Sequence, residues 1–209
     1  MLYDISPPLN SQIGVWPGDS PLTRETILDI QHGANLTLST LRTTVHVGAH
    51  ADAPSHYESA GVSIAECPLE AYLGECQIVR VAPDRGTRVH VAAMLDPIVA
   101  PRVLFSTGTF PNASNFNTDF AGLGEDLIDY LGRHGVVLVG VDTPSLDLFD
   151  SKSLPAHKAA YRHRICILEG LLLAEVPEGV YELVALPLRL VGFDASPVRA
   201  ILRSMNAMS

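Results

Sequence analysis

Residues 46–57 read HVGAHADAPSHY and contain three of the eight histidines in this 209-residue chain. His46 and His50 are four residues apart, a spacing that would also suit a helix. The β-branched run before His46 opposes a helix, and so do Gly48 and Pro54 within the segment. The sequence therefore predicts a strand that passes into a turn.

Four polar side chains of this segment occupy even-numbered positions, and an extended chain would direct all of them to one face. They are His46, His50, Asp52 and His56. On a fully extended strand His46 and His50 would lie roughly 13 Å apart, at about 3.3 Å per residue. Because the ligands of one zinc ion all end about 2.0–2.2 Å from the metal, the backbone has to bend. Gly48 and the neighbouring alanines permit this bend.

Imidazoles and a carboxylate are ligands that suit Zn²⁺ and related divalent ions. The alternative is a polar surface turn in which the histidines are incidental. The density of the cluster and the small residues between its members favour a metal site.

Further donor residues lie in residues 154–173, LPAHKAAYRHRICILEGLLL, which contain His157, His163 and Glu169. Glu169 is embedded in an apolar stretch that is typical of a strand, where an unpaired carboxylate is costly to desolvate. A cation beside it would offset that cost. The alternative is that Glu169 faces solvent or pairs with Arg164.

Composition and charge oppose several other classes of protein. The net charge of −9 argues against nucleic-acid binding, which requires a basic face. No apolar run approaches the roughly 20 residues of a membrane span, and the first residues lack the features of a signal peptide. Three cysteines, none in a CxxC pair, are typical of a reduced cytoplasmic protein.

The arrangement of apolar segments predicts a strand-rich mixed α/β fold. Strands are expected at 36–46, 76–82, 102–108, 136–142, 164–170 and 181–192, and helices at 121–134 and, more briefly, near 89–95 and 197–204. No repeat or linker divides the chain, so we expect one domain over residues 1–209.

The segment HVGAHADAPSH resembles the His-x-Gly-x-His-x-Asp-x-Pro-x-His signature of the cyclase family of metal-dependent hydrolases. Within that family the chain is most similar to the bacterial-type kynurenine formamidases. The similarity extends over the whole chain and includes VWPGD at 15–19, GVDTPSLD at 140–147, AHKAAYRHRICILEGL at 156–171 and LVALPLRLVGFDASPVRAIL at 183–202. It implies a homodimer with a mixed α/β fold of the swivelling β/β/α type.

The resemblance also implies two zinc ions in each subunit. His46, His50 and Asp52 would hold one zinc. Asp52 would also reach the second zinc, together with His157, and Glu169 would bridge both ions.

The implied reaction is the hydrolysis of N-formyl-L-kynurenine to L-kynurenine and formate, a step of tryptophan degradation, by water that zinc activates. By the same resemblance, His56 would act as the general acid and base rather than as a ligand. Trp16, the only tryptophan, would line the substrate pocket; the alternative is that it is simply a core residue. Asp142 either supports the site or belongs to an ordinary Asp-Thr-Pro turn.

Two other functions remain open at this stage. A cyclic-amide hydrolase of the isatin hydrolase type would use the same metal ligands. A non-catalytic metal-binding protein is the alternative from a different class, but structural zinc sites usually close their coordination with cysteine and histidine. The mixed set expected here contains two carboxylates and no cysteine, which favours catalysis.

Overall fold

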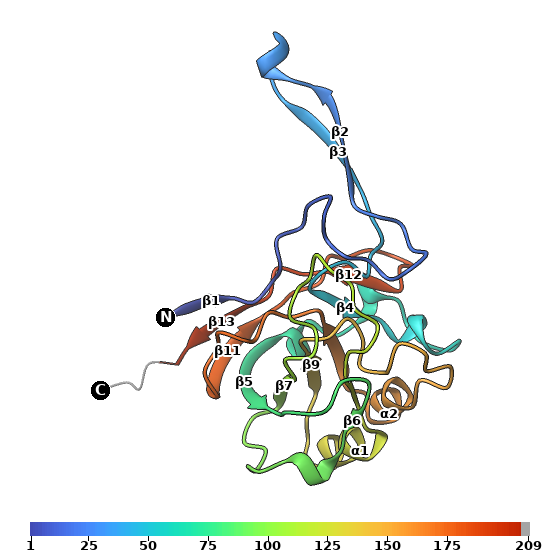
Figure 1. The fold of residues 1–209 in the computed structure, drawn as a ribbon, viewed down its shortest axis with the longest axis vertical. Coiled ribbons are helices and arrows are strands. Elements are labelled where there is room, and N and C mark those ends of the chain that lie inside the picture. Colours follow the sequence, from blue (N-terminus) through green and yellow to red (C-terminus); the bar gives the residue numbers. More distant parts are fainter. Residues whose placement is uncertain (206–209) are drawn as a thin grey trace.

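The computed structural model describes residues 1–205, and a curved sheet of nine strands forms its centre (Figure 1). The order across the sheet is β1-β13-β11-β5-β7-β9-β10-β4-β12. The bounds are β1 Leu2–Asp4, β4 His50–Asp52, β5 Leu73–Arg80, β7 Arg102–Ser106, β9 Leu138–Val141, β10 Cys166–Glu169, β11 Gly179–Val184, β12 Ala195–Pro197 and β13 Ile201–Ser204. The strand-rich mixed α/β prediction is therefore confirmed.

The middle of this sheet is parallel and fully covered. Strands β5, β7, β9 and β10 pair in parallel, and every residue of β7 and of β9 is buried. Strands buried on both faces are typically continuous apolar runs rather than alternating ones. The run VVLVGV that contains β9 follows this rule, and its interpretation as a buried strand is confirmed.

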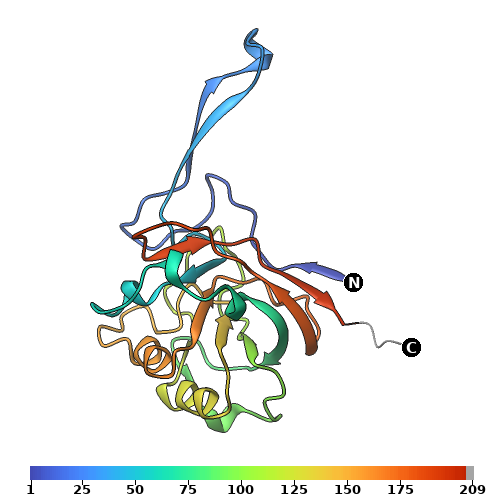
Figure 2. The same ribbon diagram turned by 180° about the vertical axis from the view of Figure 1, so that it is seen from behind.

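Two helices cover one face of the sheet, namely α1 (Glu125–Arg133) and α2 (Pro155–His163). They lie side by side in both ribbon views (Figures 1 and 2). Apolar residues of α1, among them Leu127 and Leu131, pack with Val139 of β9 and Ile167 of β10. The helix predicted at 121–134 is confirmed in α1.

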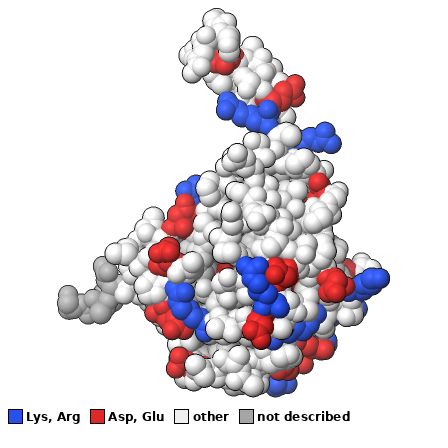
Figure 3. Space-filling view, viewed as in Figure 1, with Lys and Arg blue, Asp and Glu red and all other residues white. Residues whose placement is uncertain are grey.

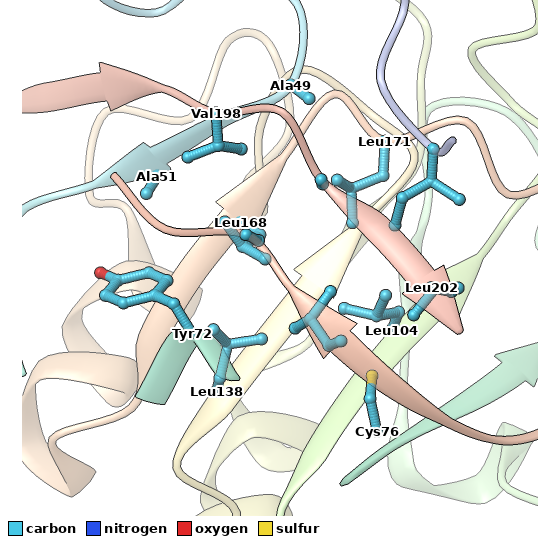
Figure 4. Close-up of a cluster of buried hydrophobic side chains, with 14 of the residues drawn as sticks. Ala49, Ala51, Tyr72, Cys76, Leu104, Leu138, Leu168, Leu171, Val198 and Leu202 are labelled. Atoms are coloured by element: carbon cyan, nitrogen blue, oxygen red, sulfur yellow. The ribbon is translucent and has the colours of Figure 1, made fainter. Parts of the chain in front are cut away.

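A second apolar cluster fills the opposite face of the sheet (Figure 4). It joins Leu104, Leu138 and Leu168 from the central strands to Ala51 of β4 and Leu202 of β13. Because side chains alternate along a strand, this packing fixes which residues of β4 and β10 face the helices instead.

Three expectations from the sequence are wrong or too long. Residues 197–204 are not helical, because β13 pairs with both β1 and β11 and this tertiary pairing overrides local helix propensity. The segment near 89–95 forms only the strand β6 (Arg88–Val89) and a short 3₁₀ turn, η5 (Val91–Ala93). The strand expected at 181–192 ends at Val184.

Helix α2 was not expected from the sequence. It begins at Pro155, in the first helical position, where the missing N–H has no intrahelical partner to lose. It ends at His163, and the next residue, Arg164, adopts a left-handed conformation with a φ of 56°. Apart from His157, its buried residues are alanines, Ala156 and Ala159 among them, so it packs closely without a strong apolar stripe.

A two-stranded arm projects from the body in both ribbon views (Figures 1 and 2). It consists of β2 (Thr23–Leu28) and β3 (Leu38–Arg42), which pair antiparallel, and of the 3₁₀ turn η1 (Ile30–His32). Every residue of both strands is exposed. The strand predicted at 36–46 exists, but its apolar side chains face no core of this chain.

The remaining elements are short. Strands β6 and β8 (Gly122–Leu123) pair in parallel, and further 3₁₀ turns are η2 (Pro54–His56), η3 (Ile64–Glu66) and η4 (Leu69–Tyr72). Among residues 1–205, no helix has both the length and the apolar character needed to cross a bilayer. Figure 3 shows few charged residues on the upper part of the body, below the base of the arm.

Candidate metal centre

The bend predicted within residues 46–57 lies at Gly48, which has a φ of 58°. A Cβ at this position would approach within 2.7 Å of Leu9 Cδ2. Gly170, with a φ of 68°, follows the last residue of β10, and a Cβ there would lie 2.1 Å from the carbonyl oxygen of Gly48. Glycine is needed at both positions because the two backbones approach closely and each needs a left-handed conformation.

Strand register brings the two donor segments together. Strand β4 pairs antiparallel with β10, so His50 lies opposite Glu169, and Ala51 lies opposite Leu168. Ala51 and Leu168 point into the core away from the helices (Figure 4). His50, Asp52 and Glu169 therefore point to the helix-covered face, where α2 supplies His157.

The carboxylate of Asp52 lies between the histidines of residues 46–50 on one side and His157 of α2 on the other. Its Oδ1 is 3.0 Å from His46 Nδ1 and 3.5 Å from His50 Nε2. Its Oδ2 is 3.5 Å from His157 Nε2. One oxygen thus faces each group, which is the arrangement that a bridging carboxylate requires.

Glu169 has the same relationship to these histidines. Its Oε2 lies 3.3 Å from His50 Nε2, and its Oε1 lies 3.3 Å from His157 Nε2. Oε1 also accepts a hydrogen bond of 2.7 Å from the backbone N–H of Leu146. Each of the two carboxylates therefore links the histidine of β4 to the histidine of α2.

Several atoms of the cluster that could bind a metal are buried without a hydrogen-bond partner. They are both carboxylate oxygens of Asp52 and Nε2 of His50. The surrounding imidazoles are close, but they are not aligned as hydrogen-bond donors to these atoms. Buried polar groups are normally satisfied, and buried charges are normally paired or coordinate a metal. The residues present therefore fit one or more divalent cations.

The local pKa values show how strongly this site favours positive charge. Burial disfavours a charged imidazole at His46, but close contact with Asp52, aided by Asp194 and Glu169, outweighs it and raises the pKa to about 9. Burial likewise opposes ionisation of Asp52, yet His157 and His46 hold the pKa of that carboxyl well below its usual value. Asp52 and Glu169 both remain ionised, because the neighbouring histidines can carry the positive charge that offsets theirs.

Each of the three predicted histidine ligands is held by an acceptor on its other ring nitrogen. His50 Nδ1 lies 2.9 Å from the carbonyl oxygen of Gly48, and His157 Nδ1 lies 2.8 Å from Asp147 Oδ2. His46 Nε2 lies 3.0 Å from Asp194 Oδ2. Such contacts orient metal-binding imidazoles and fix the nitrogen that carries the proton.

Sequence reasoning missed Asp147 and Asp194. Arg88 donates a 2.6 Å hydrogen bond to Asp147 and so anchors the carboxylate that contacts His157. Both aspartates lie in the blocks that carry the family resemblance, but neither has a spacing that links it to a histidine. Only the fold brings these pairs together.

His56 lies at the edge of the cluster. Its ring centroid is 4.2 Å from that of His46, and its side chain is 36% exposed, whereas those of His50 and His157 are 3% exposed. His46, Asp52 and His56 also offer ligand atoms that lie within 4.8 Å of one another. The geometry is therefore compatible both with a fourth ligand and with an acid/base group that reaches solvent.

The cluster opens into a cavity of about 450 Å³. Trp16 lines this cavity together with Phe110 and Phe116, and the histidines of the cluster line it as well. The indole of Trp16 stacks on Phe149, with ring centroids 4.8 Å apart and an angle of 25° between the planes. Trp16 thus belongs both to an aromatic cluster and to the cavity wall. The phenylalanines were not singled out from the sequence.

Asp142 and His163, the other polar residues considered from the sequence, make contacts outside the histidine cluster. Asp142 lines the cavity, but it accepts hydrogen bonds from Thr107 and from the N–H of Gly108, so it holds a loop in place. His163, for which no role was expected, pairs with Asp129 at 2.9 Å.

Comparison with known proteins assigns the chain to a family. The model of the Cyclase family matches residues 3–148. The chain belongs to the cyclase family. A solved structure described as a potential metal-dependent hydrolase with cyclase activity is 30% identical to it, with a TM-score of 0.84, and the match covers 97% of this chain and 96% of the other. A predicted metal-dependent hydrolase from Bacillus stearothermophilus is 32% identical, with a TM-score of 0.80 and 97% of each chain covered.

Isatin hydrolase A from Labrenzia aggregata, in a structure with benzyl benzoate bound, is 22% identical to this cyclase-family chain. Its TM-score is 0.83, over 97% of this chain and 93% of the other. At that identity the likeness shows the fold alone. The cyclase match includes Trp16 and the segment 46–57, whereas His157 and Glu169 lie beyond residue 148.

Proposed function

We propose that this cyclase-family chain is a metal-dependent hydrolase that converts N-formyl-L-kynurenine to L-kynurenine and formate. The observation that carries the proposal is the buried pair Asp52 and Glu169, each with one oxygen toward His50 and the other toward His157. The Asp52 oxygen that faces His50 also faces His46. The two relatives at 30% identity or more, both described as metal-dependent hydrolases, support the hydrolase assignment.

The ligand set proposed for two zinc ions follows from the two sides of the carboxylates. His46 and His50 lie on the Oδ1 side of Asp52, and His157 lies on the Oδ2 side. Glu169 would span both positions. Zinc bound there would lower the pKa of a bound water to about 7 and polarise the carbonyl of the substrate.

The proton transfers are assigned to His56. Water attacks the formyl carbon, and His56 takes a proton from the attacking water. As the bond between the formyl carbon and the arylamine nitrogen breaks, His56 delivers this proton to the nitrogen, so that formate and the free amine leave. An imidazole suits both directions of transfer, because it can accept a proton on one nitrogen and donate it again.

The cavity suits the aryl part of this substrate. Trp16, Phe110 and Phe116 present aromatic surface beside the metal-binding residues, and aromatic rings stack or meet edge to face at favourable distances. A volume of about 450 Å³ lies within the range of small-molecule sites. We propose Trp16 as the residue that holds the aryl ring.

The test is release of formate from N-formyl-L-kynurenine by zinc-loaded and by metal-stripped protein, with isatin as the second substrate. We expect turnover of formylkynurenine only after zinc loading, while circular dichroism shows the same fold in both states. Turnover of isatin but not of formylkynurenine would refute the proposed substrate and would still agree with a metal-dependent hydrolase. Unfolding on metal removal, without turnover of either compound, would instead indicate a structural metal site.

We also propose that the chain forms a homodimer through the β2–β3 arm. An isolated two-stranded hairpin is marginally stable in water, and neither face of this arm packs on the body. Its side chains Ile30 and Leu41 are 61% and 63% exposed. A second copy of the chain would cover this apolar surface and would offer an equivalent arm in return.

The state of the cysteines supports the proposal that the protein functions in the cytoplasm. Cys67, Cys76 and Cys166 are all free, and the first two are buried. Burial raises the pKa of the Cys166 thiol to about 11, so the group stays protonated at neutral pH. Unreactive free thiols are typical of a reducing compartment.

A further inference from the structure

A single carboxylate oxygen of Asp194 contacts two of the three histidines in the segment 46–57. Its Oδ2 lies 3.0 Å from His46 Nε2 and 3.4 Å from His56 Nδ1. The acceptors beside the other two ligand histidines, the carbonyl of Gly48 and the carboxylate of Asp147, each contact only one imidazole of the cluster. Asp194 therefore connects a proposed metal ligand to the proposed acid/base residue.

The fold holds the backbone of Asp194 in place on both sides. Its carbonyl oxygen accepts a 2.8 Å hydrogen bond from the N–H of Ala53, and the following residue, Ala195, is paired with Asp52 across β12 and β4. The carbonyl of Phe193 accepts a further bond of 2.9 Å from Ile64. Asp194 thus lies immediately before the edge strand β12, which is paired with β4.

A carboxylate can only accept hydrogen bonds, so the ring nitrogen that faces it has to carry the proton. His46 has a carboxylate beside each ring nitrogen, Asp194 beside Nε2 and Asp52 beside Nδ1, each at 3.0 Å. A metal held by Nδ1 and Asp52 would displace only the proton on Nδ1, so Nε2 is the nitrogen that would keep its proton. For His56 the nitrogen that faces Asp194 is Nδ1, which leaves Nε2 free to accept a proton. One residue selects the useful tautomer at two imidazoles.

We propose that Asp194 is a positioning residue that fixes the orientation and tautomer of His46 as a metal ligand and of His56 as a proton acceptor. This inference rests on the metal centre of the proposed function. It does not depend on the identity of the substrate, because metal affinity and tautomers can be measured without turnover.

The decisive variant is Asp194→Asn in the zinc-loaded protein. An asparagine can turn either its carbonyl oxygen or its amide group toward the two imidazoles. The amide group is a donor, and the carbonyl oxygen lacks the negative charge that makes a carboxylate a strong acceptor. We expect zinc affinity to fall by about 10–100-fold, the usual effect of losing an outer partner of a metal-binding histidine. We expect kcat to fall by more than KM changes, because His56 loses its preferred tautomer.

A spectroscopic measurement separates positioning from a general structural effect. The ¹⁵N signals of the His56 imidazole should show the Nδ1-protonated tautomer in the unchanged protein and a mixture in Asp194→Asn. The matched control is Asp126→Asn, because Asp126 contacts His90 at 2.8 Å far from the site. This control should keep wild-type zinc affinity.

Asp194→Ala removes both contacts, and its effect on the fold should be small because the side chain is half-exposed and contributes little to the core. Wild-type zinc affinity and unchanged His56 tautomers in both Asp194→Asn and Asp194→Ala would overturn the inference. Absence of formylkynurenine hydrolysis in the unchanged protein would count against the proposed substrate only. The affinity and the tautomers would still decide the role of Asp194.

Discussion

His50 and Glu169 lie directly opposite each other across β4 and β10, although 119 residues separate them in the sequence (169 − 50 = 119), and His50 Nε2 is 3.3 Å from Glu169 Oε2. The register of a single antiparallel pair thus creates half of the candidate metal centre. Because side chains alternate along strands, a slip of one residue would turn the donor of one strand into the apolar core. Ala51 and Leu168, which pack in that core, oppose such a slip.

Removing the carboxylate of Asp52 should remove both metal ions. Its two oxygens face different histidines, and neither has a hydrogen-bond partner from the protein. We expect Asp52→Ala to contain no stoichiometric zinc by elemental analysis, while Asp126→Ala, changed in the same way outside the site, keeps the full content. Two zinc ions per chain in Asp52→Ala would contradict the bridging role.

His56→Ala distinguishes an acid/base residue from a ligand. If His56 transfers protons, the variant should keep two zinc ions per chain and lose turnover by about 10²–10⁴-fold, the usual worth of general acid/base catalysis. Elemental analysis and steady-state kinetics on the same preparation check this. A variant that loses one zinc ion but stays folded would make His56 a ligand.

Zinc binding should strengthen as pH rises. The pKa of His46 is raised to about 9 in the metal-free protein, so a proton competes with the metal for Nδ1 below that pH. The apparent affinity should therefore increase between about pH 6 and pH 9 and level off above that range, with protons released on binding. Competition titrations with a chromophoric chelator measure this, and an affinity that does not vary with pH would contradict it.

Alanine at Gly170 should destabilise the fold more than alanine at Gly86. The two glycines have nearly the same φ, 68° and 69°, so each variant incurs about 1–2 kcal/mol of left-handed strain. Nothing lies within 4 Å of a Cβ at Gly86, whereas at Gly170 the Cβ meets the Gly48 carbonyl. Overpacking should add about 1–3 kcal/mol to the loss. Urea denaturation of both variants checks the difference, and equal losses would contradict the close approach.

A charged residue on the arm should dissociate the proposed homodimer. We expect Leu41→Asp to be monomeric by analytical ultracentrifugation at concentrations where the unchanged chain is dimeric, because an aspartate would be costly to bury in an apolar contact. Thr40→Asp, next to it on β3, tests the added charge without removing an apolar side chain and should dissociate the dimer less. If the unchanged chain is itself monomeric, the proposed homodimer is wrong.

Much of the candidate site could be predicted because the types and the spacing of its residues are unusual within short stretches of sequence. The histidines of segment 46–57 required a bend, and Gly48 provides it. The apolar strand around Glu169 indicated that its carboxylate needs a partner, and the structure places it beside two histidines. These arguments depend on residue type and parity, which a sequence displays directly.

The residues that sequence reasoning missed depend on tertiary pairing. Asp194 reaches His46 only because β12 adds to the far side of β4, and no local pattern announces that partner. The same cause explains the error at 197–204, where an apparent helix is a strand between β1 and β11. Of the two arm strands, β3 lies within the predicted strand 36–46, whereas β2 was not predicted. The absence of a core against this arm could not be predicted from its sequence.

The position of β4 also determines when the site can assemble. This strand is synthesised early, whereas its neighbours β10 and β12 follow more than a hundred residues later. While the chain is still growing on the ribosome, His50 and Asp52 have no strand beside them and no opposing carboxylate. A cation that needs both His157 and Glu169 could therefore be held only after residue 169 is made; before residue 157 is made, the ligands of residues 46–57 are the only ones present at this place.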